Sequence, residues 1–319
     1  RWYMYIASAG YPSTLPIDAA GHVMQNGWAF LPVYPFLIGG FAAITHLSWS
    51  LVAVAVSLVS GWGFMLVLYR LMRKQLTAAQ STWAVIFASI APASPIFGVG
   101  YAEAFYLFLL ALALLVLTER HYLLVALLLP VMAFTRPGAL AMAVTIAIHA
   151  MLRWRARRTD PFPTRQRLAV VALAVWAGVL GVAWMLIAAF VTGVPDAYLQ
   201  TELSWRAAYI GWGPLTPGTA WFEAANWWFG QPWTWALPLA ALAAFAAILM
   251  LPQTRKLGPI MPAWLISYGV YLFLVFFPQS SSMRILAPMF PVTGVLAQIR
   301  STVVKVLIGL ACIAGQVWW

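Results

Sequence analysis

Long apolar runs with few charges are the feature that most constrains how this chain can fold. A helix that crosses a membrane needs about 20 mostly apolar residues. Ten successive runs approach or exceed that length, and only the last contains a charged residue, Lys305. We therefore predict an all-α polytopic membrane protein with about ten spans. The runs are 48–69, 82–99, 104–118, 121–134, 137–152, 168–191, 233–251, 259–277, 285–299 and 302–319, of which 104–118, 121–134 and 285–299 are short enough to tilt little, stop partway or extend into flanking polar residues.

The composition excludes a soluble enzyme and a disordered chain. Apolar residues make up 64% of the chain and charged residues 8%, whereas soluble domains have about 45–50% and about 25%. The hydrophobicity is also far too high for disorder. The one cysteine, Cys312, lies in an apolar run, and the four histidines are scattered without metal-ligand spacing. We therefore predict no disulfide framework, no metal site and no cofactor.

The basic residues predict an orientation in the membrane. The formal net charge of +11 would indicate nucleic acid in a soluble protein, but here it marks topology, because cytoplasmic loops carry the Lys/Arg excess. With the connection after run 48–69 inside, 14 of the 18 basic residues lie inside and five of the seven acidic residues lie outside. We expect membrane lipids as partners and no nucleic acid. The charged residues left outside are Arg1, Arg136, Arg206, Arg284, Asp18, Glu103, Asp196, Glu202 and Glu223.

This orientation predicts one integral-membrane domain over residues 1–319. Residues 1–47 would form the first extracytoplasmic loop and 192–232 the second, with transmembrane helices over 48–191 and 233–319. Pro32 and Pro35 favour interfacial helices in the first loop over a crossing. Because the chain begins at Arg1 without a signal-like region, we also expect upstream residues and one further span.

Three charges at run ends on the outer side are the best candidates for a site. Glu103 lies in YAEAF, Arg136 in FTRPG and Arg284 in SSSMRIL. Together they could bind an anionic lipid head group, with arginine as the phosphate fork. Alternatively, Glu103 pairs with an arginine only to make both charges tolerable in the membrane.

Aromatic residues are dense in both outer loops. Aromatic faces can stack on sugar rings, but tryptophan and tyrosine also form belts at membrane interfaces. The candidate sugar or acceptor contacts are Trp28, Tyr34, Tyr101 and Trp205. The motifs of soluble enzymes are absent: the chain has no GxGxxG, Walker loop, HExxH or GxSxG.

Five segments occur together in a recognisable order. They are WYMYIASAGYP, NGWAFLPVYP, SPIFGVGYAEAFYLFLL, FTRPGAL and SSMRILAPMFP. In this order they resemble the PIG-V-type mannosyltransferases, which are the GPI mannosyltransferase 2 family and its bacterial relatives within the GT-C glycosyltransferases. The chain has VYP where many relatives have LYP, and AE where many have TE.

The resemblance implies a GT-C-like helix bundle and a polyprenyl-phosphate-mannose-dependent mannosyltransferase. Such an enzyme moves mannose, with inversion and without a metal, to a lipid-linked acceptor on the extracytoplasmic face. Its general base would be a carboxylate just upstream of Arg1, with Glu103 as an orienting group or fallback base. The donor phosphate would bind Arg284, with Arg136 or Arg206 second and His22 as a hydrogen-bond donor. An alanine-rich composition with compact loops favours a bacterial plasma membrane, with the endoplasmic reticulum as the eukaryotic counterpart.

Two other functions remain open at this stage. A polyprenyl-lipid flippase or transporter would share the apolar spans and the phosphate-binding arginines, but its polar site would lie near mid-membrane. A non-catalytic membrane subunit would retain the site as a relic.

Overall fold

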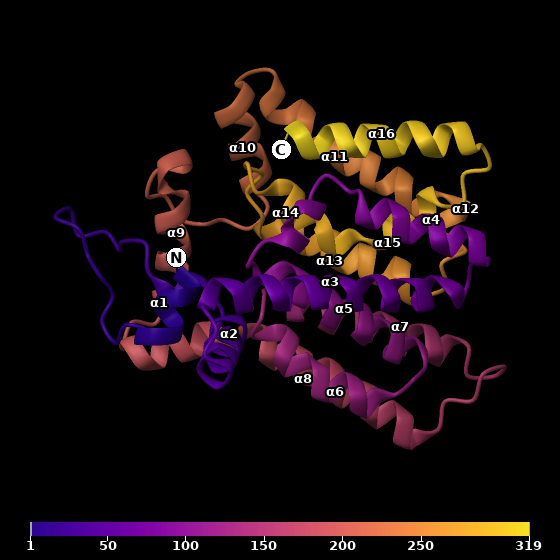
Figure 1. Cartoon of the computed structure of the whole chain (residues 1–319), viewed down its shortest axis with the longest axis horizontal. Coiled ribbons are helices and arrows are strands. Elements are labelled where there is room, and N and C mark those ends of the chain that lie inside the picture. The colour runs from indigo at the N-terminus through magenta and orange to yellow at the C-terminus, as the bar shows by residue number, and fades with distance from the viewer. Residues whose placement is uncertain (1, 319) are drawn as a thin grey trace.

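The computed structural model describes residues 2–318, and its regular structure is helical (Figure 1). Within that range the only β-type pairing is an isolated bridge between Ile17 and Val23. The first half contains α1 (Trp2–Ala9), η1 (Gly27–Ala29), α2 (Val33–Thr45), α3 (Trp49–Arg73), α4 (Ala78–Ser89), η2 (Ser94–Gly98), α5 (Ala102–Thr118), α6 (Tyr122–Ala133) and α7 (Ala139–Arg155). The second half contains α8 (Thr164–Thr192), α9 (Ala197–Ile210), α10 (Ala220–Phe229), α11 (Trp233–Met250), α12 (Pro252–Arg255), α13 (Ile260–Val275), α14 (Ser282–Leu286), η3 (Ala287–Met289), α15 (Pro291–Leu296) and α16 (Thr302–Trp318).

Three helices are long and apolar enough to cross a membrane. They are α3, α8 and α11, with 25, 29 and 18 residues. At 1.5 Å per residue they measure about 37, 43 and 27 Å, against a hydrocarbon core of about 30 Å. Shorter apolar helices are α2, α5, α6, α13 and α16. The fold class is thus confirmed as all-helical with membrane-type helices, and the number of spans stays a prediction.

Prolines break two of the apolar runs that the sequence presents as continuous. Run 82–99 is helical only to Ser89 in α4, after which Pro92 and Pro95 lead into the short helix η2. Run 285–299 is divided into α14, η3 and α15, with Pro288 and Pro291 at the junctions. Proline lacks the backbone N–H and its ring clashes with the preceding turn, so neither run forms one straight helix.

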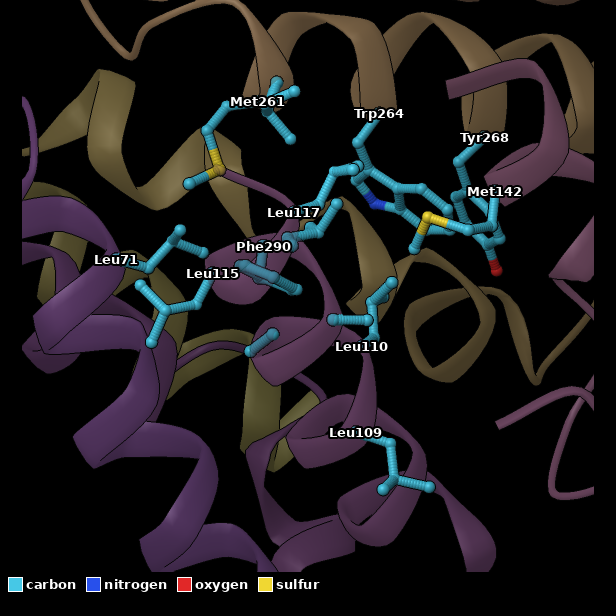
Figure 2. Packing of buried hydrophobic residues seen from close by; sticks show 14 of the residues in the cluster. Leu71, Leu109, Leu110, Leu115, Leu117, Met142, Met261, Trp264, Tyr268 and Phe290 are labelled. Atoms are coloured by element: carbon cyan, nitrogen blue, oxygen red, sulfur yellow. The ribbon is translucent and has the colours of Figure 1, made fainter. Parts of the chain in front are cut away.

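Helix α5 lies at the centre of the largest buried cluster. Most of its residues are buried, on every side of the helix, as expected for a helix that is apolar all round. Leu109, Leu110, Leu115 and Leu117 of α5 pack within the same cluster as Trp264 of α13 (Figure 2). The first turn of this central helix carries Glu103, so the fold places that carboxylate within the bundle rather than on its outside.

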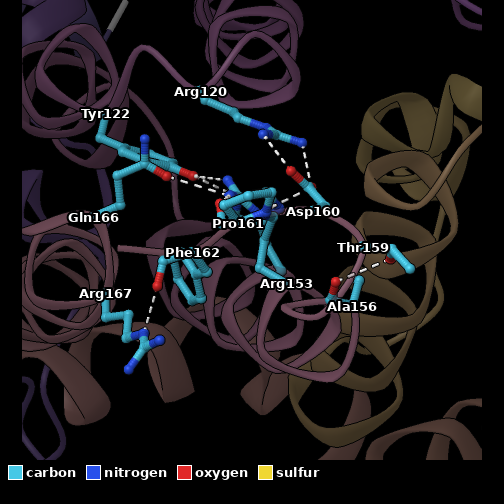
Figure 3. A network of polar contacts seen from close by, with 11 residues as sticks. Arg120, Tyr122, Arg153, Ala156, Thr159, Asp160, Pro161, Phe162, Gln166 and Arg167 are labelled. Atoms are coloured by element: carbon cyan, nitrogen blue, oxygen red, sulfur yellow. Dashed lines mark hydrogen bonds and ion pairs between the residues drawn. The ribbon is translucent and has the colours of Figure 1, made fainter. Parts of the chain in front are cut away.

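Ion pairs gather at opposite ends of α5. Beyond its last turn, Glu119 pairs with Lys74 at 2.5 Å, and Asp160 pairs with both Arg120 and Arg153 (Figure 3). In its first turn, Glu103 pairs with Arg136 and Arg284. We call these the Asp160 end and the Glu103 end. Each pair joins residues that the charge distribution assigns to the same side of the membrane.

The segments expected in the first outer loop lie at the Glu103 end, together with α9 (Figure 1). Helix α2 begins at Val33, just after Pro32, and runs across the direction of α3 instead of along it. Whether α2 lies at a membrane interface stays a prediction.

Candidate functional site

Glu103 is the central residue of the candidate site. It lies in the first turn of α5, where the helix dipole favours a negative charge, and only 2% of its surface is exposed. A buried charge needs compensating partners. Its Oε1 accepts a hydrogen bond from Nη1 of Arg136 at 2.5 Å and lies 3.0 Å from Nε of Arg284. One carboxylate oxygen is thus shared by two guanidinium groups.

The turn between α6 and α7 positions Arg136. The backbone N–H of Arg136 bonds to the carbonyl of Met132 at 3.2 Å, which extends the end of α6 by one turn. Two residues on, Gly138 leaves room for the Tyr106 hydroxyl, which lies 2.0 Å from where a Cβ would stand. The glycine in TRPG therefore permits close approach of this turn to α5.

Arg284 comes to the site from the short helix α14. Its guanidinium carbon lies 5.4 Å from the centre of the Tyr101 ring, within the range of a cation–π contact. The next residue is fixed from α13, because the Tyr268 hydroxyl donates to the carbonyl of Ile285 at 2.9 Å. The Tyr101 ring thus contacts the Arg284 side chain, and Tyr268 fixes the backbone beside it.

Several buried polar atoms at this end have no hydrogen-bond partner within residues 2–318. They include Glu103 Oε2, the Tyr106 hydroxyl and Trp205 Nε1. An unsatisfied buried polar group costs about 1–3 kcal/mol, and such groups in native proteins call for an explanation. With two arginines and one glutamate the cluster is positively charged, and the Arg284 side chain is 27% exposed. The arrangement can therefore accept an anionic group that also offers hydroxyls.

Tyr3 of α1 is a member of this site that the sequence did not identify. It interacts electrostatically with Glu103, Arg136 and Arg284. Burial raises the pKa of Tyr3, and the Glu103 carboxylate adds to that rise, so Tyr3 offers a neutral hydroxyl. In the sequence Tyr3 resembles any other residue of an aromatic belt, and only packing distinguishes it.

A second acidic group, Glu202, lies on α9. Burial raises the pKa of the Glu202 carboxyl, opposed by the charge of Arg206 and by a hydrogen bond with Tyr198. Tyr271 of α13 interacts electrostatically with Glu202, Arg206 and Arg136. Arg206, a predicted phosphate ligand, is therefore coupled to the Glu103 cluster through Tyr271 instead of belonging to it directly, and Glu202 is an addition that sequence reasoning missed.

The other predicted site residues are placed differently. His22 stacks on Trp212 with ring centroids 4.1 Å apart and pairs with Asp18 at 3.7 Å, in a loop that extends away from the bundle (Figure 1). Tyr101 is exposed beside Arg284. Trp205 packs edge-on against Trp2.

Trp28 and Tyr34 face protein, not open space. Trp28 is 2% exposed, donates from Nε1 to the carbonyl of Pro12 at 3.0 Å, and packs against Trp184. Tyr34 is fully buried, with its hydroxyl 3.3 Å from Ser57 Oγ. Neither ring presents a face to a sugar in this conformation, because tertiary packing covers both.

The carboxylate expected upstream of Arg1 lies outside the described residues. Within residues 2–318 no three His, Cys, Asp or Glu side chains gather as a metal-ligand set. Comparison with protein-family models and with curated proteins found no match.

Proposed function

We propose that the chain is a membrane glycosyltransferase that takes mannose from a polyprenyl-phosphate carrier at the Glu103 end. The observation that carries the proposal is the buried Glu103 carboxylate, which shares Oε1 between Arg136 and Arg284 while Oε2 has no partner. The unpaired Oε2 leaves an acceptor free for a hydroxyl of a bound ligand. The choice of mannose and of the carrier follows from the resemblance to PIG-V-type enzymes.

In the proposed reaction the acceptor hydroxyl attacks the anomeric carbon of a β-linked mannosyl phosphate. A base takes the hydroxyl proton, a C–O bond forms with inversion, and the phosphate leaves with the bonding electrons. Because that phosphate is already charged, cations stabilise its departure without a general acid. Arg284 would contact the phosphate, with Arg136 behind it. Glu103 would orient Arg284 or the acceptor, and it would act as base if no carboxylate precedes Arg1.

The proposal includes a location. The Glu103 end would face the extracytoplasmic side of a bacterial plasma membrane, because the Asp160 end carries the excess of basic residues. Acceptors would then be glycolipids that reach the site from the bilayer.

A flippase for the same carrier is the second candidate. It gains support from the arginines, since a lipid phosphate needs them in either function. A transporter would place its polar groups near mid-membrane. The clustering of Glu103, Arg136 and Arg284 at one end of α5 favours the enzyme.

The test uses the purified full chain in vesicles with synthetic polyprenyl-phosphate-mannose and a panel of mannoside glycolipids. We expect a new α-mannoside and free polyprenyl phosphate. Arg284→Ala should weaken donor binding at least tenfold while the protein still folds, because Glu103 keeps Arg136 as a partner. Arg158→Ala is the matched control, since Arg158 lies in the loop at the other end. Translocation of the donor without any glycoside product would refute the enzyme and support the flippase.

A further inference from the structure

A cavity at the Asp160 end lies far from the proposed catalytic groups. It lies between the start of α6 and the start of α8 and has a volume of about 510 Å³, a size typical of ligand sites. Arg120, His121 and Tyr122 line one side, and Arg165 and Gln166 line the other. An inference from this cavity is independent of the proposed function.

The wall of this cavity is positively charged and is hydrogen-bonded to a buried arginine. Arg153, which is 5% exposed, stands behind it. Its Nη1 donates to the Tyr122 hydroxyl at 3.2 Å and its Nη2 donates to Gln166 Oε1 at 3.2 Å (Figure 3). Because Gln166 uses its oxygen in this bond, its amide N–H groups remain for a ligand. Asp160 neutralises only one of the charges of Arg120 and Arg153.

Arg165 supplies the cation that is free for a ligand. Its side chain is exposed on the first turn of α8 and makes no hydrogen bond or ion pair with another described residue. The beginnings of both helices add to the effect, since unpaired N–H groups and the helix dipole favour anions there. His121, at the start of α6, makes no capping hydrogen bond with its side chain.

The rim of the cavity is apolar on the α6 side. Leu123 and Leu124 line the cavity and are 74% and 47% exposed. A soluble phosphate compound would gain nothing from these leucines, whereas acyl chains beside the head group would cover them. Basic pockets between helices on the cytoplasmic side of membrane proteins bind the head groups of anionic lipids.

We propose that this cavity binds the phosphate head group of an anionic phospholipid, held by Arg165, His121 and Gln166, with its acyl chains against Leu123 and Leu124. The bound lipid would bridge α6 and α8. A soluble phosphate compound offers the same phosphate group as the lipid, so the experiment must distinguish the two.

The experiment measures lipids retained by the purified full chain, using native mass spectrometry with phosphatidylglycerol and phosphatidylcholine in equal amounts. We expect selective retention of phosphatidylglycerol. Arg165→Gln should weaken it about tenfold, the effect of one lost contact to a charged group of about 1.4 kcal/mol. His121→Gln is a second variant in the same cavity. Arg158→Gln removes the same charge from an exposed position outside the cavity, and we expect less than a twofold change.

Three results would overturn the proposal. Equal losses in Arg165→Gln and Arg158→Gln would mean that only the diffuse charge of this end attracts lipid. Equal retention of the two lipids would mean that the head group is not recognised. Displacement of phosphatidylglycerol by millimolar inorganic phosphate or glycerol phosphate would identify a soluble phosphate ligand instead. Selective loss in both cavity variants, with no displacement by these anions, would support the lipid site.

Discussion

Replacing Glu103 by glutamine removes the negative charge of the site and leaves its shape almost unchanged. Glutamine has almost the same size and can still accept at its oxygen, but the charge that Arg136 and Arg284 share is lost. Removing one partner of a buried ion pair costs about 3–5 kcal/mol. Since the two arginine side chains are 19% and 27% exposed, water screens part of the loss, and we expect the lower limit of about 3 kcal/mol.

The assay is thermal unfolding in nanodiscs, followed by tryptophan fluorescence. A chain of this size shifts its Tm by about 2 °C for each kcal/mol, so Glu103→Gln should unfold about 6 °C below the wild type. Glu223→Gln is the control, because Glu223 of α10 has no ion pair with another described residue. Its Tm should stay within about 1 °C of the wild type.

A double-mutant cycle shows whether the loss comes from the proposed contact. In the Glu103→Gln background, Arg284→Gln should cost less than in the wild type, with a coupling of about 1–3 kcal/mol. Two results would refute the reasoning. One is a Tm for Glu103→Gln equal to that of the wild type, and the other is strict additivity of the two substitutions, which would place the stabilising interaction elsewhere.

Three further predictions follow from single contacts. Gly138→Ala should destabilise the fold by about 1–3 kcal/mol through overpacking, and Tyr106→Phe should recover part of the lost Tm by removing the clashing hydroxyl; an unchanged Tm contradicts the close approach. Hydrogen bonds from Arg120 hold the pKa of Asp160 below its usual value. The Asp160 carboxylate therefore stabilises the fold at pH values above its usual pKa, and this stabilisation is lost as the pH falls through the lower pKa of the folded state. Asp160→Asn should raise amide exchange in the 156–163 loop at neutral pH but not in strong acid. Burial raises the pKa of Glu202, so its protonated form favours folding and wild-type stability rises as pH falls; Glu202→Gln should raise Tm at pH 7, with a gain that shrinks in acid.

Much of the helical fold and part of the site could be predicted from the sequence. Glu103, Arg136 and Arg284 each interrupt or border an apolar run. Alternating the predicted membrane spans assigns all three to the same side, so the sequence alone predicted that they lie at one end of the bundle. The short run 121–134 corresponds to α6, a helix of 12 residues and about 18 Å. That is shorter than the hydrocarbon core, and such a helix was one of the outcomes expected for this run.

The site residues that the sequence did not identify depend on packing between segments that are distant in the chain. Tyr3 and Trp28 are both aromatic residues in the aromatic-rich segment 1–47, and nothing in the sequence distinguishes them. In the structure, Tyr3 lies beside the charged cluster and Trp28 is covered by Trp184. Periodicity gives no information on which neighbour covers a ring. Likewise, the apolar count treated 285–299 as one run, although Pro288 and Pro291 divide it into short helices.

The energetics of the cluster argue for a role beyond stability. Apolar residues of similar volume often stabilise a protein as much as a buried ion pair, or more, so stability alone does not require Glu103 and two arginines here. The cluster also leaves Glu103 Oε2 and the Tyr106 hydroxyl without a hydrogen-bond partner, and a bound ligand could satisfy both. If the site binds a lipid phosphate, Glu103→Gln should lower Tm and yet tighten the binding of polyprenyl phosphate, because both guanidinium groups become free for the anion. Opposite changes in stability and affinity distinguish a binding site from a purely structural ion pair, whose loss would lower Tm without any gain in affinity.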